Sequence, residues 1–166
     1  MRLTDLTLED CNLAREWRNK DISAYRTPYF LTGFMQDNFY HEVVSDRNSK
    51  HRYMAVDYHD TLMAMIGLCN IEWENKNAEI SIVVNPKKRR TGTGRESLLL
   101  LLNWGFNELG LENIYGEYYQ SSPNRLFWIN IIKEYGIYNT VLPMRKFHDG
   151  KLYDSIYFNF NKGDLK

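Results

Sequence analysis

Alternating apolar and polar residues mark several short stretches of the chain. A period of two residues predicts strands with one buried face, because successive side chains of a strand point to opposite sides. The stretches that read as strands are 3–8, 52–58, 62–73, 78–84, 114–119, 141–147 and 155–160. Turn residues at 59–60, 74–77 and 149–150 separate neighbouring stretches and favour antiparallel hairpins.

Apolar residues at helical spacing predict helices between these strands. We expect Asp10 to cap the first helix, which runs to about residue 20. An aromatic-rich loop over 22–34 follows it. Further helices are expected at 36–45, 95–109 and 124–135. Leucines at helical spacing in the third helix predict that it packs on the core.

The order of these elements predicts the fold class. Three consecutive antiparallel strands precede one β–α–β unit, whereas a doubly wound fold alternates strands and helices throughout. We therefore expect an α/β (α+β) fold, with a mixed, mostly antiparallel sheet of about six to seven strands flanked by about four helices. The length of 166 residues fits a single domain over 1–166.

Composition supports a folded domain and argues against several classes of protein. With 43% apolar and 14% aromatic residues the chain can fill a core. The 21 basic and 21 acidic side chains cancel, so we expect neither nucleic-acid nor membrane binding. The longest apolar run, 98–102, is too short for a membrane span, and the first residues do not resemble a signal peptide.

Cysteine and histidine usage suggests a reduced compartment and no metal. Cys11 and Cys69 lie far apart and form no CxxC pair, which fits a cytoplasmic protein with free thiols. The four histidines show no metal-ligand spacing. We therefore predict a cytoplasmic protein without a metal site.

A glycine-rich loop between a buried strand and a helix is the most informative segment. The loop over 89–94 places Gly92 and Gly94 directly before the helix, so the backbone can approach a ligand closely. The unpaired N–H groups and dipole of a helix N-terminus favour phosphate there. The loop lacks the Walker pattern, and Ser97 replaces the third glycine of a dinucleotide fingerprint.

The segment 78–109 resembles the central motif of the GNAT acetyltransferases. Their signature, [Arg or Gln]-x-x-Gly-x-[Gly or Ala], reads Arg89-x-x-Gly92-x-Gly94 here. The resemblance implies acetyl-CoA as co-substrate, with its pyrophosphate on the loop residues Arg89, Arg90, Thr91, Gly92, Thr93, Gly94 and Arg95. It also implies that the pantetheine arm follows Ile82, Val83, Val84, Asn124, Phe127 and Trp128.

Two further features resemble one branch of that family. Trp17-Arg18-Asn19 and the hairpin at 149–151 look like the branch that acetylates ribosomal-protein N-termini, small amines and amino sugars. The chain departs from the family after the fourth helix, where Gly136-Ile137 stands one residue later than the usual Gly-Phe.

The chemistry of amine acetylation suggests catalytic residues. An alkyl ammonium is neutral in only about one molecule in a thousand at pH 7, so the reaction needs a base. Glu79 is the candidate base, since several GNAT enzymes resemble this chain in placing a glutamate there. A backbone N–H near Val83 would stabilise the oxyanion. Tyr135, and after it Tyr138, are the candidate proton donors to the departing thiolate.

The sequence is less specific about the acceptor than about the cofactor. Acidic and aromatic side chains near the reaction centre would favour a cationic acceptor. The candidate acceptor-binding residues are Tyr25, Tyr29, Phe30, Glu72, Trp73 and Glu74. A protein N-terminus, a polyamine, an aminoglycoside or an amino sugar all fit this description.

Alternatives remain open at this point. A non-catalytic acyl-CoA sensor would keep the glycine loop and need no base. Lys87–Arg90 also matches a nuclear-localisation or nucleic-acid patch, or a solvated charge run, and Glu79 could be a structural glutamate paired across the sheet. The many aromatic residues allow a homodimer.

Overall fold

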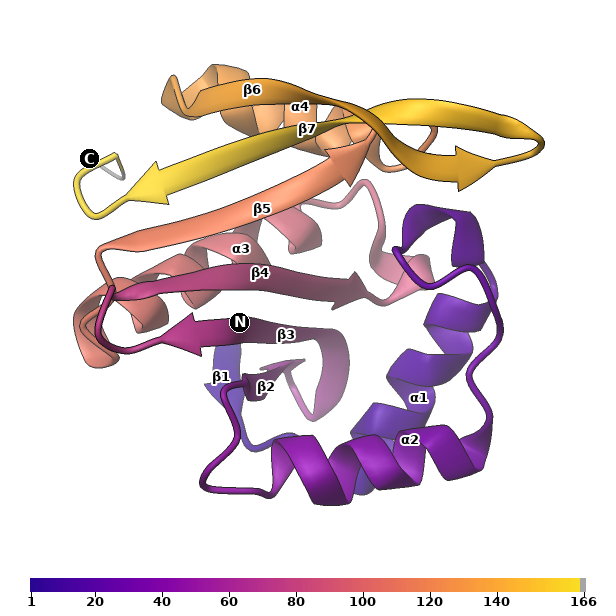
Figure 1. The fold of residues 1–166 in the computed structure, drawn as a ribbon. Coiled ribbons are helices and arrows are strands. Elements are labelled where there is room, and N and C mark those ends of the chain that lie inside the picture. The colour runs from indigo at the N-terminus through magenta and orange to yellow at the C-terminus, as the bar shows by residue number, and fades with distance from the viewer. Residues whose placement is uncertain (165–166) are drawn as a thin grey trace.

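A seven-stranded sheet runs through the computed structural model, which describes residues 1–164 (Figure 1). The strands lie in the order β1-β2-β3-β4-β5-β7-β6, and every neighbouring pair is antiparallel except β4 and β5. Their bounds are β1 Arg2–Thr4, β2 Arg52–Tyr58, β3 Thr61–Glu72, β4 Asn77–Val84, β5 Asn113–Tyr119, β6 Tyr138–His148 and β7 Lys151–Asn161. The predicted mixed, mostly antiparallel α/β sheet is confirmed.

Four α-helices cover the two faces of this sheet in the described part of the chain. They are α1 Leu8–Asn19, α2 Gly33–Phe39, α3 Thr93–Asn103 and α4 Arg125–Tyr135. The α2 and α3 helices each continue into one π-helical turn, Tyr40–Val44 and Trp104–Glu108, and 3-10 turns form at Ile22–Ala24 and Pro86–Lys88. No helix in residues 1–164 is long and apolar enough to cross a membrane.

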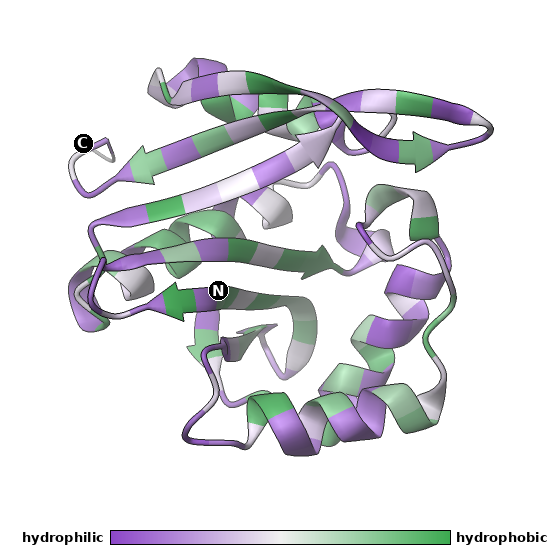
Figure 2. Cartoon of the chain, in the orientation of Figure 1, coloured by the Kyte–Doolittle hydropathy of each residue, from purple (hydrophilic) through white to green (hydrophobic). Residues whose placement is uncertain are grey.

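The core divides into two layers because successive strand residues face opposite sides of the sheet. Leu98 and Leu101 of α3 and Ile131 of α4 pack with Ile66 on one face. On the other face, Cys11, Ala14 and Trp17 of α1 pack with Met65 and Val83. The hydrophobic end of β4 thus lies between two helical layers (Figure 2).

The start of α1 differs from its prediction. The first strand ends at Thr4, and Thr7 rather than Asp10 caps the helix. The Thr7 hydroxyl accepts from the Asp10 amide at 3.1 Å, and the Asp10 carboxylate accepts from the Thr7 amide at 3.0 Å. This reciprocal capping box satisfies two backbone donors, and Asp10 is its N3 residue instead of the predicted N-cap.

The bounds of other helices and strands also differ from the prediction. The second helix begins earlier than predicted, at Gly33, because the Thr32 hydroxyl accepts from the Met35 amide. The terminal hairpin is longer, with 11 residues in each of β6 and β7. The third strand ends at Glu72, so Trp73 lies in the following turn.

The divergence of β4 and β5 is the feature that creates a site. Their parallel pairing covers only Asn77–Glu79 with Asn113–Tyr115. Beyond these pairs the strands separate, as Figure 1 shows, while β4 continues to pair with β3 as far as Val84. The edge of β4 from Ile80 to Val84 therefore lacks a strand partner on its β5 side.

Candidate functional site

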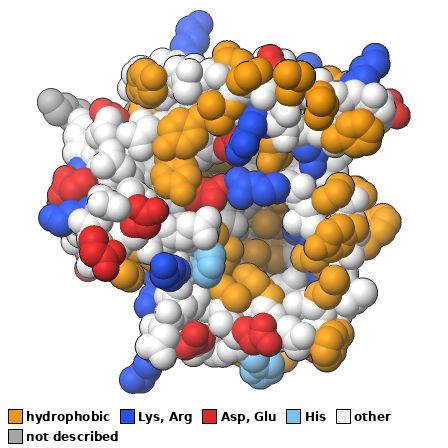
Figure 3. All heavy atoms as spheres, viewed as in Figure 1, with side chains coloured by type: hydrophobic (Ala, Val, Ile, Leu, Met, Phe, Trp, Pro, Cys, Tyr) orange, Lys and Arg blue, Asp and Glu red, His pale blue; other side chains and the backbone are white. Residues whose placement is uncertain are grey.

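A cleft of about 990 Å³ occupies the gap between β4 and β5. Residues from both faces of the sheet line it, including Phe127 and Trp128 from the α4 layer and Phe39 and Met65 from the α1 layer. Figure 3 shows a hollow in this face of the molecule, with basic side chains beside it. The cleft has two ends, which we call the α3 end and the α1 end.

The α3 end is built from the backbone of the glycine loop. Its lining residues are Arg89, Arg90, Gly92, Gly94 and Arg95. Gly92 has φ +89° and Arg90 has φ +62°, and Gly92 is the N-cap of α3 with no side-chain cap. The first N–H groups of the helix therefore face a ligand site surrounded by arginines, an arrangement that binds phosphate. The structure thus brings five of the predicted loop residues together in the cleft lining.

Two threonines hold this loop in shape. The Thr91 hydroxyl donates to the Lys88 carbonyl at 2.7 Å and lies 2.9 Å from the Thr93 hydroxyl. Thr93 is buried, and neither threonine side chain lines the cleft. The threonines thus support the loop, whereas the arginines and glycines face the ligand site.

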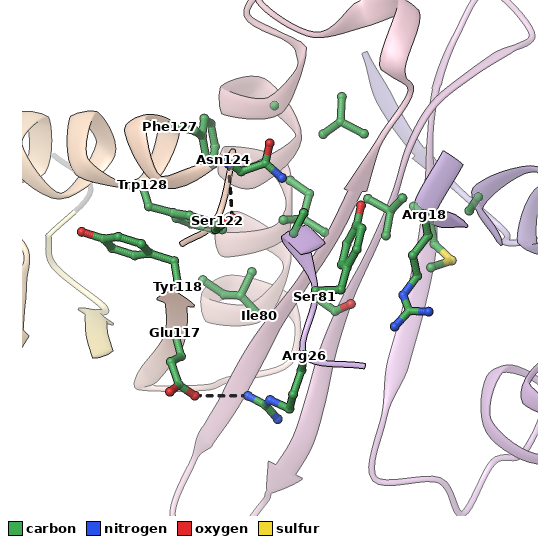
Figure 4. A pocket seen from close by; sticks show the side chains of 18 of the residues that line it. Arg18, Arg26, Ile80, Ser81, Glu117, Tyr118, Ser122, Asn124, Phe127 and Trp128 are labelled. Carbon is green, nitrogen blue, oxygen red and sulfur yellow. Dashed lines mark hydrogen bonds and ion pairs between the residues drawn. The ribbon is translucent and has the colours of Figure 1, made fainter. Parts of the chain in front are cut away.

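One wall of the cleft combines the free edge of β4 with the start of α4. Ile82, Val83 and Val84 line it opposite Asn124, and a side chain at Gly94 would come within 3.3 Å of the Phe127 ring. The rings of Phe127 and Trp128 lie 4.9 Å apart in an edge-to-face arrangement. Asn124 is the N-cap of α4 but makes no side-chain capping bond, so its amide is available to a ligand. Figure 4 shows Asn124, Phe127 and Trp128 on one side of the cleft.

Arg26 bridges two carboxylates where β4 and β5 separate. Its Nη2 atom donates to Glu79 Oε1 at 2.6 Å and to Glu117 Oε2 at 3.4 Å, and its Nε atom donates to the Tyr119 hydroxyl at 3.3 Å. Burial lowers the pKa of Arg26, but the hydrogen bonds to Tyr119 and Glu79 outweigh it and raise that pKa. The alternative interpretation of Glu79 as a structural, paired glutamate thus has a physical basis. Its partner, Arg26, lies in the loop after α1.

Both carboxylates have further partners. Glu79 Oε2 accepts from the Asn70 side chain at 3.1 Å. Glu117 accepts from Arg145 at 3.3 Å and from the Ser155 hydroxyl. The negative charge in the cleft is therefore largely compensated by neighbouring protein groups.

The α1 end is built from side chains. Its lining residues include Arg15, Arg18, Tyr25, Gln36, Phe39, Tyr53 and Cys69. The Tyr53 hydroxyl and Cys69 Sγ lie 3.0 Å apart. Burial raises the pKa of Tyr25 and of Tyr53, so both phenols are protonated at neutral pH and can serve as hydrogen-bond donors.

Most of the predicted acceptor-binding residues lie elsewhere. Glu72 lines a separate hollow, while Trp73 and Glu74 lie in the β3–β4 turn and do not line the cleft. This turn is at the start of β4, where Glu72 pairs with Asn77, whereas the cleft opens toward the end of that strand. Tyr29 and Phe30 are 53% and 64% exposed and also lie outside the cleft lining, so only Tyr25 of this set lines it.

The two predicted proton donors are likewise outside the cleft. The Tyr135 hydroxyl, in the last turn of α4, accepts from Arg95 at 2.7 Å. Tyr138 is 68% exposed and lines the separate hollow with Glu72. The first turns of α4 face the cleft, and its last turn does not.

Few of the cleft residues that were not predicted have a recognisable signal in the sequence. Glu117 interrupts an otherwise apolar and aromatic strand, and a buried charge usually has a functional or structural partner. Nothing local identified Arg26, Asn70 or Tyr53, because their roles depend on contacts across the sheet. Within residues 1–164 no group of three His, Cys, Asp or Glu side chains is arranged to hold a metal ion.

Comparisons with known proteins agree on the kind of domain. The family model described as an acetyltransferase (GNAT) domain matches residues 1–123. A spermidine N(1)-acetyltransferase of Vibrio cholerae is 25% identical over 99 residues, covering 58% of this chain and 56% of that protein. This chain therefore matches little more than half of that relative's length.

Solved structures extend the likeness of fold to nearly the whole chain. The spermidine N-acetyltransferase of Vibrio cholerae in complex with CoA and spermine has a TM-score of 0.85 at 19% identity, covering 98% of this chain and 96% of that one. A dodecameric structure of that enzyme in an intermediate state has a TM-score of 0.80 at 20% identity, covering 97% of this chain and 93% of that one. At this level of identity the likeness shows a shared fold.

Proposed function

Because this chain belongs to the GNAT acetyltransferase family, we propose that it transfers the acetyl group of acetyl-CoA to a primary amine bound in the cleft between β4 and β5. The observation that carries this proposal is the continuity of that cleft. It connects an uncapped helix N-terminus surrounded by arginines with a carboxylate, Glu79, where the strands separate. A phosphate-bearing acyl donor and an amine would thus meet beside a base.

The residues that line the α3 end have the chemistry that CoA binding requires. The free N–H groups at the start of α3, with Arg89, Arg90 and Arg95, would hold its pyrophosphate. The unpaired edge of β4 would bind the pantetheine amides as an added strand does. When bound, acetyl-CoA supplies an activated acetyl thioester.

Glu79 is our proposed general base. It lies at the last residue pair before the strands diverge, and its side chain is 13% exposed, so it lines the cleft without being open to bulk solvent. It would take the ammonium proton directly or through a water molecule. Arg26 keeps the Glu79 carboxylate in place, as the 2.6 Å contact indicates.

The remaining steps need few protein groups. A backbone N–H near Val83, on the free edge of β4, would stabilise the oxyanion. Since a thiol has a pKa of about 8.5, CoA can leave as a thiolate and take a proton from water. We therefore do not assign Tyr135 or Tyr138 as proton donors to the thiolate, because both lie outside the cleft.

The family specifies the acceptor only as an amine. The names of the similar Vibrio cholerae proteins point to a polyamine. Protein N-termini, aminoglycosides and amino sugars also carry the required amine.

An exposed face of β6 supports self-association. Val141, Met144 and Phe147 are 53%, 66% and 66% exposed on this edge strand. Since the similar structure is dodecameric, we propose that the chain forms an oligomer rather than specifically a dimer. Light scattering on the wild type and on Phe147→Glu tests this, and a monomeric wild type would contradict it.

The test of the main proposal is a calorimetric titration with acetyl-CoA, followed by a thiol-release assay with a panel of amines. The wild type should bind acetyl-CoA and release CoA when a suitable amine is added. Gly94→Trp should lose binding, since even a Cβ at this position approaches Phe127. Gly163→Trp, which adds the same side chain in open space, is the matched control.

Two outcomes would contradict the proposal in different ways. A folded wild type that fails to bind acetyl-CoA would refute the assigned site. Tight binding with no transfer to any amine of the panel would favour the acyl-CoA sensor instead.

A further inference from the structure

Arg18 presents a guanidinium group without an acidic partner to the α1 end of the cleft. Its Nη1 atom is buried and has no hydrogen-bond partner among residues 1–164. None of the ion pairs in this part of the chain includes Arg18. The guanidinium lies over the Tyr25 ring, with Cζ 5.1 Å from its centroid. Leaving a buried cationic donor unsatisfied is costly, so this atom needs an explanation.

The surroundings of Arg18 are cationic or neutral. Burial lowers its pKa, and the groups that oppose this effect are the phenols of Tyr25, Tyr29 and Tyr53. Burial and the charge of Arg18 together lower the pKa of Lys146, whose Nζ atom donates to the Tyr25 carbonyl at 2.8 Å. A second cation thus lies close enough to repel Arg18.

The nearby acids are already engaged. Asp21 pairs with Arg89 at 3.5 Å. Arg26 holds both Glu79 and Glu117. The α1 end therefore has an excess of positive charge, which opposes a polycationic acceptor and favours an anionic one.

We propose that Arg18 binds an anionic group of the acceptor, a carboxylate or a phosphate, so that the substrate is a primary amine that also carries a negative charge. This inference rests on the proposed acetyl transfer and specifies its acceptor. Figure 4 shows Arg18 on the α1 side of the cleft, across β4 from Glu117 and Trp128. An acceptor anchored at Arg18 lies in the same cleft as Glu79, where its amine is deprotonated. An arginine is suited to this role because its planar fork matches carboxylate and phosphate oxygens.

Pairs of acceptors that differ only in the anionic group test the proposal. Glucosamine 6-phosphate against glucosamine examines phosphate, and a dipeptide against its C-terminal amide examines carboxylate. For each pair, kcat/KM is measured with the wild type and with Arg18→Gln, and spermidine serves as the polycation. We expect the wild type to prefer the anionic member of one pair by about tenfold or more, and Arg18→Gln to abolish that preference.

Equilibrium binding gives a readout that does not depend on turnover. The same acceptors are titrated calorimetrically into the wild type and Arg18→Gln, each with and without CoA. Only the anionic ligand should bind more weakly to the variant, and Arg18→Lys should restore part of the affinity. Lys20→Gln removes an exposed charge beyond the end of the same helix and lies outside the cleft, so it controls for general electrostatics.

Each contrary result has a distinct meaning. A wild type that prefers spermidine to both anionic acceptors, or an Arg18→Gln variant that weakens neutral and anionic ligands equally, overturns the proposal. Weaker acetyl-CoA binding by Arg18→Gln with unchanged acceptor preference would assign Arg18 to CoA instead. No acetyl-CoA binding by the wild type would refute the proposed function itself, and the titrations without CoA would still test the Arg18 site.

Discussion

The two ends of the cleft are built by different means. At the α3 end the ligand-facing groups are backbone N–H groups, held by a left-handed Gly92 and an uncapped helix start. At the α1 end they are side chains from α1, the following loop and β2 and β3, such as Arg18, Tyr25 and Tyr53. A site formed by backbone N–H groups needs closely spaced glycines, which can be recognised in the sequence. A site formed by side chains from several elements has no such local pattern.

Replacing Glu79, the proposed base between the two ends of the cleft, should have the largest effect. Glu79→Gln removes the proton acceptor, so kcat should fall by about 10² to 10⁴ while the Kd of acetyl-CoA stays unchanged. Stopped-assay kinetics and calorimetry measure the two quantities. Glu108→Gln, an exposed glutamate outside the cleft, is the control. Unchanged turnover in Glu79→Gln would remove this residue from the mechanism.

Acetyl-CoA binding at the α3 end should be sensitive to a side chain added at Gly92. Gly92→Val places a β-branched residue at φ +89°, which costs about 1–3 kcal/mol and distorts the loop. We expect acetyl-CoA affinity to fall by about 10- to 100-fold. Gly150→Val imposes similar strain at φ +72° in the β6–β7 turn and should lower stability without changing that affinity. Equal loss of affinity in both variants would mean that general destabilisation is responsible.

Replacing Arg26 should change which charge of acceptor the cleft prefers. Arg26→Gln releases Glu79 and Glu117 from their shared cation, so the cleft becomes more acidic. We expect kcat/KM for spermidine to rise about tenfold relative to that for an anionic amine. Arg145→Gln removes a cation that contacts only Glu117 of the two and should have a smaller effect. An unchanged ratio in Arg26→Gln would show that this charge does not select the acceptor.

A smaller effect concerns the pH dependence of stability. Burial raises the pKa of the Cys11 thiol from 9.0 to about 11. Between these values the unfolded chain loses the thiol proton and the folded chain keeps it, so the free energy of unfolding falls as the pH rises from about 9 to about 11. We expect a loss of about 1–2 kcal/mol that is missing in Cys11→Ser. Denaturant titrations across this range measure it, and parallel curves for both proteins would contradict it.

The smallest effect should follow from Tyr135→Phe. The hydroxyl accepts a hydrogen bond from Arg95, and Tyr135 does not line the cleft. We therefore expect kcat to change by less than about twofold and stability by about 1 kcal/mol. A large drop in kcat at unchanged KM would restore Tyr135 as the proton donor.

The sequence was sufficient for the fold and for the α3 end. Periodicity located every strand, and the confirmed family assignment followed from Arg89, Gly92 and Gly94. These features are local, because hydrophobic periodicity and glycine spacing act over a few residues. The family match shows a GNAT acetyltransferase domain, and acetyl transfer by this chain is our proposal.

The α1 end could not be predicted in the same way. Glu72 and Trp73 are near Glu79 in the sequence, but strand register places them at the opposite end of β4 from the open cleft. Arg26 reaches Glu79 across 53 residues of sequence, and no local pattern encodes that contact. Tyr135 is on the same helix as Phe127 and Trp128, but the last turn of α4 does not line the cleft.

The short parallel pairing of β4 and β5 also affects how the chain folds. Strands β1 to β4 follow one another in sequence as antiparallel neighbours, and β5 to β7 form a second continuous group. The hairpins β2-β3-β4 and β6-β7 make local contacts and therefore form early, whereas joining β4 to β5 requires closing the loop that contains α3. We expect the three residue pairs at Asn77–Glu79 to form late and to open first, so native-state hydrogen exchange there would report separation of the two groups.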